Sequence, residues 1–156
     1  MASSRKKLFI DFSGFADYAE RLENLGGDLK ATADKALQAS HDYVTENLKD
    51  DMKRHHKTGR TERSLLEDSK VEWTGNVGSI EVGFDIANGG LPSVFLMYGT
   101  PKHAPANQYG KASGTNHGMD ADKQLFDDVY GARTKKEVRK IQEEIFAKEI
   151  KKIMGG

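Results

Sequence analysis

The chain has 156 residues, no cysteine, and 24 lysines and arginines against 24 aspartates and glutamates, so its formal net charge is zero. This length fits one domain with a hydrophobic core of its own. The lack of cysteine excludes thiol catalysis, cysteine-ligated zinc, iron–sulfur clusters and a disulfide scaffold. Zero net charge argues against a strongly basic DNA-packaging protein. No stretch reaches the roughly 18 consecutive apolar residues of a membrane-spanning helix, and we expect no membrane partner.

The first third of the chain predicts one strand and two helices. Leu8 and Ile10 occupy alternate positions, which is typical of a strand. Apolar residues at helical spacing then predict a helix over residues 14–25, with Ser13 as its N-cap, and a long helix over residues 28–55. At 1.5 Å per residue the second helix would be about 40 Å long, so we expect it to be the scaffold of the domain.

The middle of the chain predicts a β-hairpin followed by a loop. Two β-rich runs, residues 64–73 and 77–84, are separated by Thr-Gly-Asn, the composition of a hairpin turn. For residues 91–98 we expect a short helix or an irregular segment. Residues 99–119 are rich in glycine, proline and asparagine, and loops of this length in compact domains are usually functional or disordered.

Two helices are predicted in the last quarter. The first lies within residues 120–130, and the second is expected to have Thr134 as N-cap, Glu137 at the capping-box position and an apolar stripe running towards Met154. The predicted fold is therefore of the α+β class, a small antiparallel β-sheet packed against a long α-helix and a C-terminal amphipathic helix. We expect a single domain over residues 1–156 with a long loop or insertion at about 102–132.

The sequence shows no recognised catalytic motif. Lys111 lacks the glycine spacing and the following hydroxyl of a P-loop, Ser113 lacks the flanking glycines of a nucleophile elbow, and there is no His-Glu-x-x-His pattern. We therefore predict no catalytic residues and no enzymatic activity.

The histidines do not form a metal-binding pattern. Adjacent His55 and His56 diverge by about 100° on a helix, and we expect both at a solvated helix end. His103 and His117 would need to converge across the long loop, with Asp120 or Asp122, to make a site. Exposed loop histidines are the simpler interpretation, so we predict no metal and no cofactor.

Charge is distributed unevenly along the chain. Residues 53–63 carry five lysines and arginines against one glutamate, and residues 133–152 carry eight against four, whereas residues 67–85 carry five acidic residues and one lysine. Such separated patches suit a subunit that binds copies of itself. The carboxylate pairs Asp50-Asp51 and Asp127-Asp128 are expected to lie on solvated helix faces.

Three short motifs carry a family resemblance. They are Thr-Gly-x-x-x-x-Ser-Leu at residues 58–65, Val-Gly-Phe at residues 82–84 and Tyr-Gly-Thr-Pro at residues 98–101. With the order of the elements, they make the chain resemble the tail-completion, or head–tail joining, proteins of long-tailed bacteriophages of the lambdoid type, which are neck or minor tail components. The motif positions are Thr58, Gly59, Ser64, Leu65, Gly83, Tyr98, Gly99, Thr100 and Pro101. We expect Gly59 to let the chain reverse after the long helix, and Gly99 to permit a positive φ or a close backbone approach.

The resemblance implies a structural virion protein of the phage neck, made in the host bacterial cytoplasm. It would form a ring, expected to be a hexamer, that joins the tail to the head. Its partners would be other copies of itself, the head connector and the tail terminator or tail tube proteins, with passive contact to genome DNA. Two alternatives are a tail terminator that ends tail-tube growth and a DNA-contacting channel module.

The same interpretation predicts subunit contacts. We expect the hairpin and the 102–119 loop of one subunit to meet the basic helix surface of the next. The residues expected to make such contacts are Lys53, Arg54, Arg60, Arg63, His103, Asn107, Tyr109 and His117.

Overall fold

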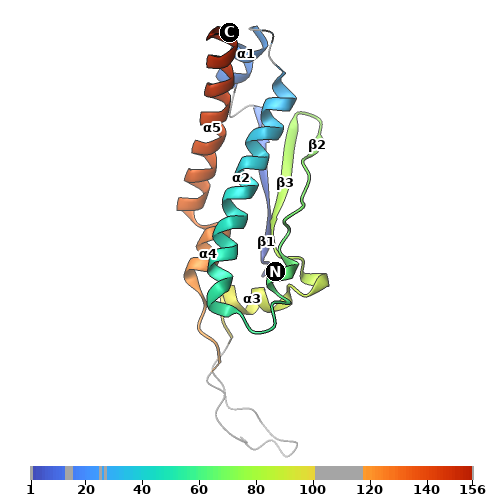
Figure 1. Ribbon diagram of the computed structural model, residues 1–156, viewed down its shortest axis with the longest axis vertical. Coiled ribbons are helices and arrows are strands. Elements are labelled where there is room, and N and C mark those ends of the chain that lie inside the picture. The colour runs from blue at the N-terminus through green and yellow to red at the C-terminus, as the bar shows by residue number, and fades with distance from the viewer. Residues whose placement is uncertain (1, 13–15, 25, 27, 101–117, 156) are drawn as a thin grey trace, which may run out of the picture.

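The computed structural model describes residues 2–12, 16–24, 26, 28–100 and 118–155. It has a three-stranded antiparallel sheet and two long helices, which confirms the predicted α+β class (Figure 1). Strands β1 (Arg5–Asp11), β3 (Val77–Gly83) and β2 (Glu72–Thr74) lie in that order across the sheet. Within the described ranges, no helix has the length and apolar content needed to cross a membrane.

Helices cover one face of the sheet. Helix α2 (Leu29–Met52) packs on β3 and β1, and α5 (Ala132–Gly155) lies beside α2 and runs in the opposite direction (Figure 1). Helix α1 (Ala16–Asn24) contacts α5 at one end of the molecule, whereas α3 (Leu91–Tyr98) and α4 (Lys123–Tyr130) lie at the other. The molecule is thus an elongated two-layer domain.

The core lies between the sheet and the helices because side chains alternate along each strand. Leu8 on β1 is opposite Ile80 on β3, and both are buried, as are Val44 and Leu48 on α2. The next residue of β1, Phe9, points to the other face of the sheet and is 57% exposed. The described elements therefore leave the outer face of the sheet open to solvent.

The long helix and its two ends are confirmed. Asp28 is the N-cap of α2, and its Oδ1 accepts a hydrogen bond from the Ala31 N–H at 2.9 Å. A 3-10 turn, η2 (Lys53–His55), follows α2 directly, so the helical segment ends where expected. Helix α1 also lies inside its predicted range, although Ser13, its expected N-cap, lies outside the described residues.

The predicted strand over residues 64–73 is wrong for most of its length. A 3-10 turn, η3 (Glu62–Ser64), occupies its start, and only Glu72–Thr74 joins the sheet. Between them, the Leu66 N–H donates to the Gly83 carbonyl and the Glu67 N–H donates to the Leu65 carbonyl, both at 2.9 Å. The second of these bonds tightens the chain into a turn and prevents an extended strand.

The predicted cap of the last helix is also wrong. Helix α5 begins at Ala132, and Thr134 is buried within its first turn. The Thr134 hydroxyl donates to the Asp127 carbonyl at 2.7 Å, which joins α4 to α5 across Gly131. Thr134 therefore satisfies a carbonyl of the preceding helix rather than the N-terminus of its own.

The predicted insertion over residues 102–132 is partly helical. Helix α4 lies within the range predicted for it, and Asp122 is its N-cap, with Oδ1 accepting from the Leu125 N–H at 3.1 Å. Residues 91–98 form α3, the helical one of the two expectations. Residues 101–117 lie outside the described part of the chain.

Candidate functional site

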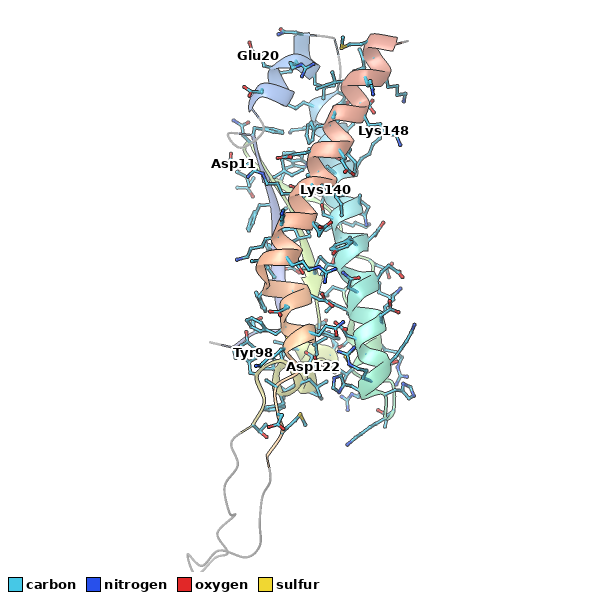
Figure 2. The ribbon with its side chains drawn as sticks, turned by 90° about the vertical axis from the view of Figure 1, so that its left-hand side faces the viewer. Asp11, Glu20, Tyr98, Asp122, Lys140 and Lys148 are labelled. Carbon is cyan, nitrogen blue, oxygen red and sulfur yellow. The ribbon has the colours of Figure 1, made fainter. Side chains whose placement is uncertain are left out.

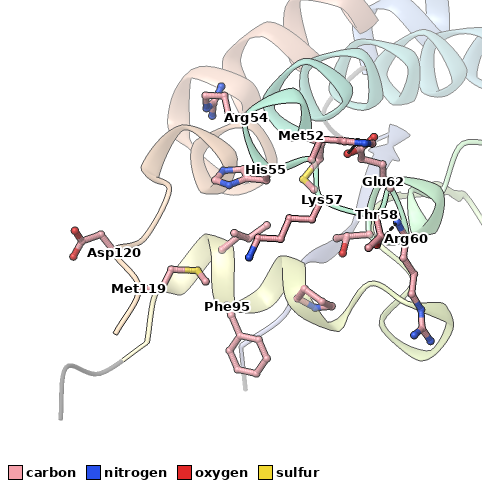
Figure 3. Close-up of a pocket in the computed structure, with 15 residues that line it drawn as sticks. Met52, Arg54, His55, Lys57, Thr58, Arg60, Glu62, Phe95, Met119 and Asp120 are labelled. Atoms are coloured by element: carbon pink, nitrogen blue, oxygen red, sulfur yellow. Dashed lines mark hydrogen bonds and ion pairs between the residues drawn. The ribbon is translucent and has the colours of Figure 1, made fainter. Parts of the chain in front are cut away.

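Two of the sequence motifs meet at one end of the molecule. Residues 58–65 follow α2 and η2, and residues 98–100 end α3. A cavity of about 510 Å³, which we call the end cavity, lies between η2, the following turn and α3 (Figure 3). It is lined by Met52, Arg54, His55, His56, Lys57, Thr58, Gly59, Arg60, Thr61, Glu62, Pro92, Phe95, Leu96, Met119 and Asp120.

The first motif is a turn that leads from α2 to the sheet. Gly59 has φ of +73°, a conformation that favours glycine, so the chain reverses there as predicted. The Thr58 carbonyl accepts a hydrogen bond from Arg63 Nη1 at 3.4 Å, and the Ser64 hydroxyl donates to the Thr61 carbonyl at 2.6 Å. These bonds give the motif residues a structural role beside the end cavity.

Leu65 and Gly83 fasten the same segment to the sheet. Leu65 is buried and forms a bridge with Phe84, the residue after β3. Gly83 has φ of +109°, and a Cβ at this position would collide with the backbone oxygen of Ser4. A glycine is therefore required where the end of β3 approaches the N-terminal segment.

The last motif follows α3, whose Pro92, Phe95 and Leu96 line the other wall of the cavity. Gly99 has φ of +74°, and a Cβ there would lie only 2.7 Å from the Met119 carbonyl oxygen. The Thr100 N–H donates to that same oxygen at 2.8 Å, and the Asp122 N–H donates to the Leu96 carbonyl at 2.7 Å. These two hydrogen bonds join the end of α3 and Thr100 to residues 119–122, which precede α4. The Tyr98 hydroxyl donates to the Ser3 carbonyl at 3.1 Å.

A carboxylate at the start of α4 organises the basic residues after α2. Asp122 Oδ2 accepts from Arg54 Nη2 at 2.8 Å and pairs with His55 Nε2 at 2.6 Å. Burial opposes ionisation of this carboxyl, but the hydrogen bonds from His55, Arg54 and the Leu125 N–H outweigh it and lower the pKa of Asp122 to about 2. The expectation of a solvated end is therefore wrong for His55, whose side chain is 24% exposed.

Other cations of this region remain available at the surface. His56 Nδ1 pairs with Glu62 Oε1 at 2.6 Å. In the described part of the structure, Lys57, Arg60 and Arg63 have no acidic partner. Figure 3 shows Lys57 lying across the cavity between η2 and α3. Of the predicted subunit contacts, Arg54 and Arg60 line the end cavity, and Lys53 and Arg63 line the neighbouring hollow.

The exposed apolar residues gather on α3 beside this cavity. Leu91, Phe95 and Tyr98 follow the i, i+4, i+7 spacing of one helix face and are 51%, 45% and 43% exposed. Met119, which is also exposed, adjoins them. Four of the six large exposed hydrophobic residues in the described ranges therefore lie at this end, and a contiguous exposed apolar patch is typical of an interaction surface.

The expectation of solvated helix faces holds for Asp50 and Asp127, which are exposed, but is wrong for Asp51 and Asp128 behind the site. Asp51 on α2 is 1% exposed, and Asp128 on α4 is half-buried. Asp51 Oδ1 accepts from Arg54 Nη1 at 3.0 Å. Burial, the hydrogen bond with Asp51 and the charge of Asp51 raise the pKa of Asp128 on α4 to about 7. Asp128 is therefore partly protonated near neutral pH.

The sequence contained a signal for this pair that the prediction did not use. Asp51 lies three residues after Leu48 and seven after Val44, and therefore on the buried face of α2. Asp128 lies three residues after the buried Leu125 on α4. A carboxylate on the apolar face of each of two helices indicates a buried contact.

The end cavity combines an apolar surface that can bury side chains with cations that can pair with carboxylates. The described residues include no group of three or more histidine, aspartate or glutamate side chains placed to hold a metal. The described part of the chain does not include the remaining predicted motif and contact residues, which are Pro101, His103, Asn107, Tyr109 and His117.

Comparisons with family models, with curated proteins and with solved structures give no match. Any function proposed for the chain therefore depends on its own residues and their geometry.

Proposed function

We propose that the chain is a structural subunit of the neck of a long-tailed bacteriophage, a tail-completion protein that forms part of a ring joining tail to head. The observation that carries the proposal is the position of the exposed apolar face of α3. It lies at the end of the molecule where two of the three motif segments of the family resemblance, residues 58–65 and 98–100, also lie. Two of the three motifs therefore adjoin a surface suited to a protein partner.

The chemistry of the end cavity supports a binding role. Arg54, His55 and Asp122 hold one another, and His56 is paired with Glu62, so the histidines maintain the shape of the site. Lys57 and Arg60 lie beside Phe95 and can pair with acidic groups of a neighbouring ring. Exposed apolar side chains beside unpaired cations are typical of a protein interface, where aromatic residues and arginine are enriched.

Disruption of the gene in the phage that encodes the chain tests this function. The expected particles, seen by electron microscopy, are DNA-filled heads and separate tails of normal length, because the joining ring is absent. Expression of the chain from a plasmid should restore joined virions. Tails of uncontrolled length would instead assign the tail-terminator role, and normal infectious virions would refute a neck function.

A further inference from the structure

The β1 strand has an open edge in the described structure. The Phe84 N–H donates to the Ser4 carbonyl at 3.1 Å, which places the backbone groups of even-numbered residues of this segment towards β3. Backbone N–H and C=O groups alternate in direction along an antiparallel strand, so those of Lys7 and Phe9 point away from the sheet. On this side the Tyr130 hydroxyl donates to the Arg5 carbonyl at 2.8 Å, but the described residues leave the edge at Lys7 and Phe9 unpaired.

A groove of about 430 Å³ lies between this edge and α5. Figure 2 views the molecule from this side and shows α5 running beside β1. The groove is lined by Lys6, Lys7, Leu8, Phe9 and Asp11 from β1 and by Thr134, Lys135, Val138, Arg139 and Gln142 from α5.

The groove contains polar donors that lack acceptors. Gln142 is 4% exposed, and its Nε2 has no hydrogen-bond partner in the part of the chain that the structure describes. Burial, and then the nearby charge of Lys135, lower the pKa of Lys6. Neither lysine forms an ion pair with a described acidic residue. Two ammonium groups and a buried amide without partners would be stabilised by carboxylates.

The opposite edge of the same sheet is acidic. Glu72 and Thr74 are opposite Ser79 and Val77 of β3, so the backbone groups of Trp73 between them point outward. Figure 1 shows β2 at the side of the sheet away from α5. Glu67 and Asp68, just before this strand, are both exposed, and Glu67 Oε2 lies 3.4 Å from Lys49 Nζ. Beside one edge of the sheet, Lys6 and Lys135 therefore have no acidic partner among the described residues, and the other edge carries exposed carboxylates.

We propose that copies of this chain associate by adding the β2 edge of one copy to the β1 edge of the next, with Glu67 and Asp68 entering the groove beside Lys6 and Lys135. This inference rests on the proposed function and deepens it, because a ring requires two different, complementary surfaces on each subunit. Main-chain hydrogen bonds between the two edge strands would hold the copies together. The opposite charges would fix the register of the two strands.

The geometry also fixes the direction of the intermolecular pair. β1 and β2 are both antiparallel to β3, so they run in the same direction. Rotation about a ring axis that runs along the strands leaves the strand direction unchanged. The β2 strand of one copy and the β1 strand of the next would therefore form a parallel pair. The residues before β2, Glu67 and Asp68, then lie beside the first residues of β1, where Lys6 is.

Charge reversal on both edges tests the proposal. Lys6→Glu with Lys135→Glu, or Glu67→Lys with Asp68→Lys, should each weaken self-association by about tenfold or more, because like charges then face each other. An equal mixture of the two double variants should associate again, since each interface then pairs opposite charges. Sedimentation velocity over a range of concentrations gives the association constants, and circular dichroism checks the fold.

The matched control changes the same charge elsewhere on α5. Lys136 and Lys140 are exposed and lie outside the groove. Lys136→Glu with Lys140→Glu should therefore leave association nearly unchanged. Equal weakening by this control and by Lys6→Glu with Lys135→Glu would overturn the proposal, as would a mixture that does not recover.

A second pair of variants tests the strand edge directly. Phe9→Pro removes an N–H that points away from β3, so the fold should persist while edge pairing is lost. Phe9→Ala keeps that N–H and controls for the side chain. In the wild-type assembly, the Lys7 and Phe9 amides should exchange hydrogen at least about tenfold more slowly than in the monomer.

The outcomes separate this inference from the proposed function. Self-association that neither the charge reversals nor Phe9→Pro weakens would overturn edge pairing and leave the neck function standing. A chain that stays monomeric at every concentration would also overturn it. Failure to join heads and tails bears on the neck function alone.

Discussion

The contact between Asp128 and Asp51 shows how a single residue can make the fold depend on pH. Asp128 on α4 lies against Asp51 on α2, and burial together with this neighbouring carboxyl raises the pKa of Asp128 to about 7. Sequence spacing indicated that Asp51 was on the apolar face of its helix. It could not indicate that Asp128, far along the chain, would lie against it. That contact depends on the packing of α4 on α2.

The pH dependence of stability should therefore follow Asp128. Its pKa is about 7 in the folded state and near the ordinary 3.8 when unfolded, so the folded chain binds more protons between these values. The free energy of unfolding should fall as pH rises from about 4 to 7 through this group. Asp128→Asn, which cannot ionise, should reduce that fall and exceed the wild type in stability above pH 7.

Urea unfolding at several pH values measures this effect. Glu144→Gln, which changes an exposed carboxylate on α5, is the control and should keep the wild-type pH profile. Parallel profiles for the wild type and Asp128→Asn would contradict a raised pKa of Asp128.

The pKa shift of Asp122 has the opposite sign to that of Asp128, and so does its effect on the pH dependence of stability. Its pKa is lowered to about 2, so its contribution to stability is present above about 4 and is lost as pH falls towards 2. Asp122→Asn keeps an N-cap oxygen but loses the charged pairs with Arg54 and His55, and should cost roughly 2 kcal/mol at neutral pH. Asp122→Ala should cost about 1 kcal/mol more, because the cap is also lost.

Chemical denaturation of the three proteins at pH 7 and pH 3 distinguishes these contributions. Equal stability of Asp122→Asn and the wild type at pH 7 would show that the ion pairs around the end cavity contribute nothing.

At the scale of helices and strands, sequence patterns predicted correctly the elements that depend only on residues close together in the chain. The cap at Asp28 and the apolar stripe of α2 are contained within one helix, and both were found. The strand over residues 64–73 failed because the backbone of Leu66 and Glu67 is bonded in a turn beside Gly83, a contact distant in sequence. The cap of α5 failed because Thr134 bonds to α4.

The end cavity could be predicted only in part. The turn at Gly59 and the positive φ at Gly99 were expected from the motifs. The position of α3 beside the turn at Gly59 depends on the packing of α3 against α4 and of α4 against α2, which no local pattern specifies.

The backbone at Gly99 is required to close the segment between α3 and α4. Its φ of +74° and ψ of 178° lie in a region essentially restricted to glycine, and a Cβ would lie 2.9 Å from the Ala121 nitrogen. Gly99→Ala should therefore destabilise the fold by roughly 3 kcal/mol. Gly75→Ala is the control, since Gly75 also has positive φ but has no atom near its Cβ position. It should cost only about 1 kcal/mol.

Thermal or urea unfolding of the two glycine variants checks this prediction. A Gly99→Ala variant no less stable than Gly75→Ala would show that the bridge between Thr100 and Met119 can shift without cost.

At the scale of the whole molecule, the net charge is zero, but the surface has three regions of different charge and polarity. The β1 edge is basic, the β2 edge is acidic, and one end of the elongated domain combines exposed apolar residues with cations. Two edges on opposite sides of a sheet suit contacts around a ring, and an apolar end suits contact with a neighbouring ring above or below it. The zero net charge is therefore the sum of separate basic and acidic patches, which in our proposal face each other between copies of the chain.

The measurement that tests this account most directly is the mass of the purified chain alone and after mixing with phage tails and heads. Native mass spectrometry of the chain should give a closed assembly of one defined number of copies at high concentration. Electron microscopy of the mixture should show that assembly at the end of the tail. A chain that remains monomeric and binds neither tails nor heads would contradict the account.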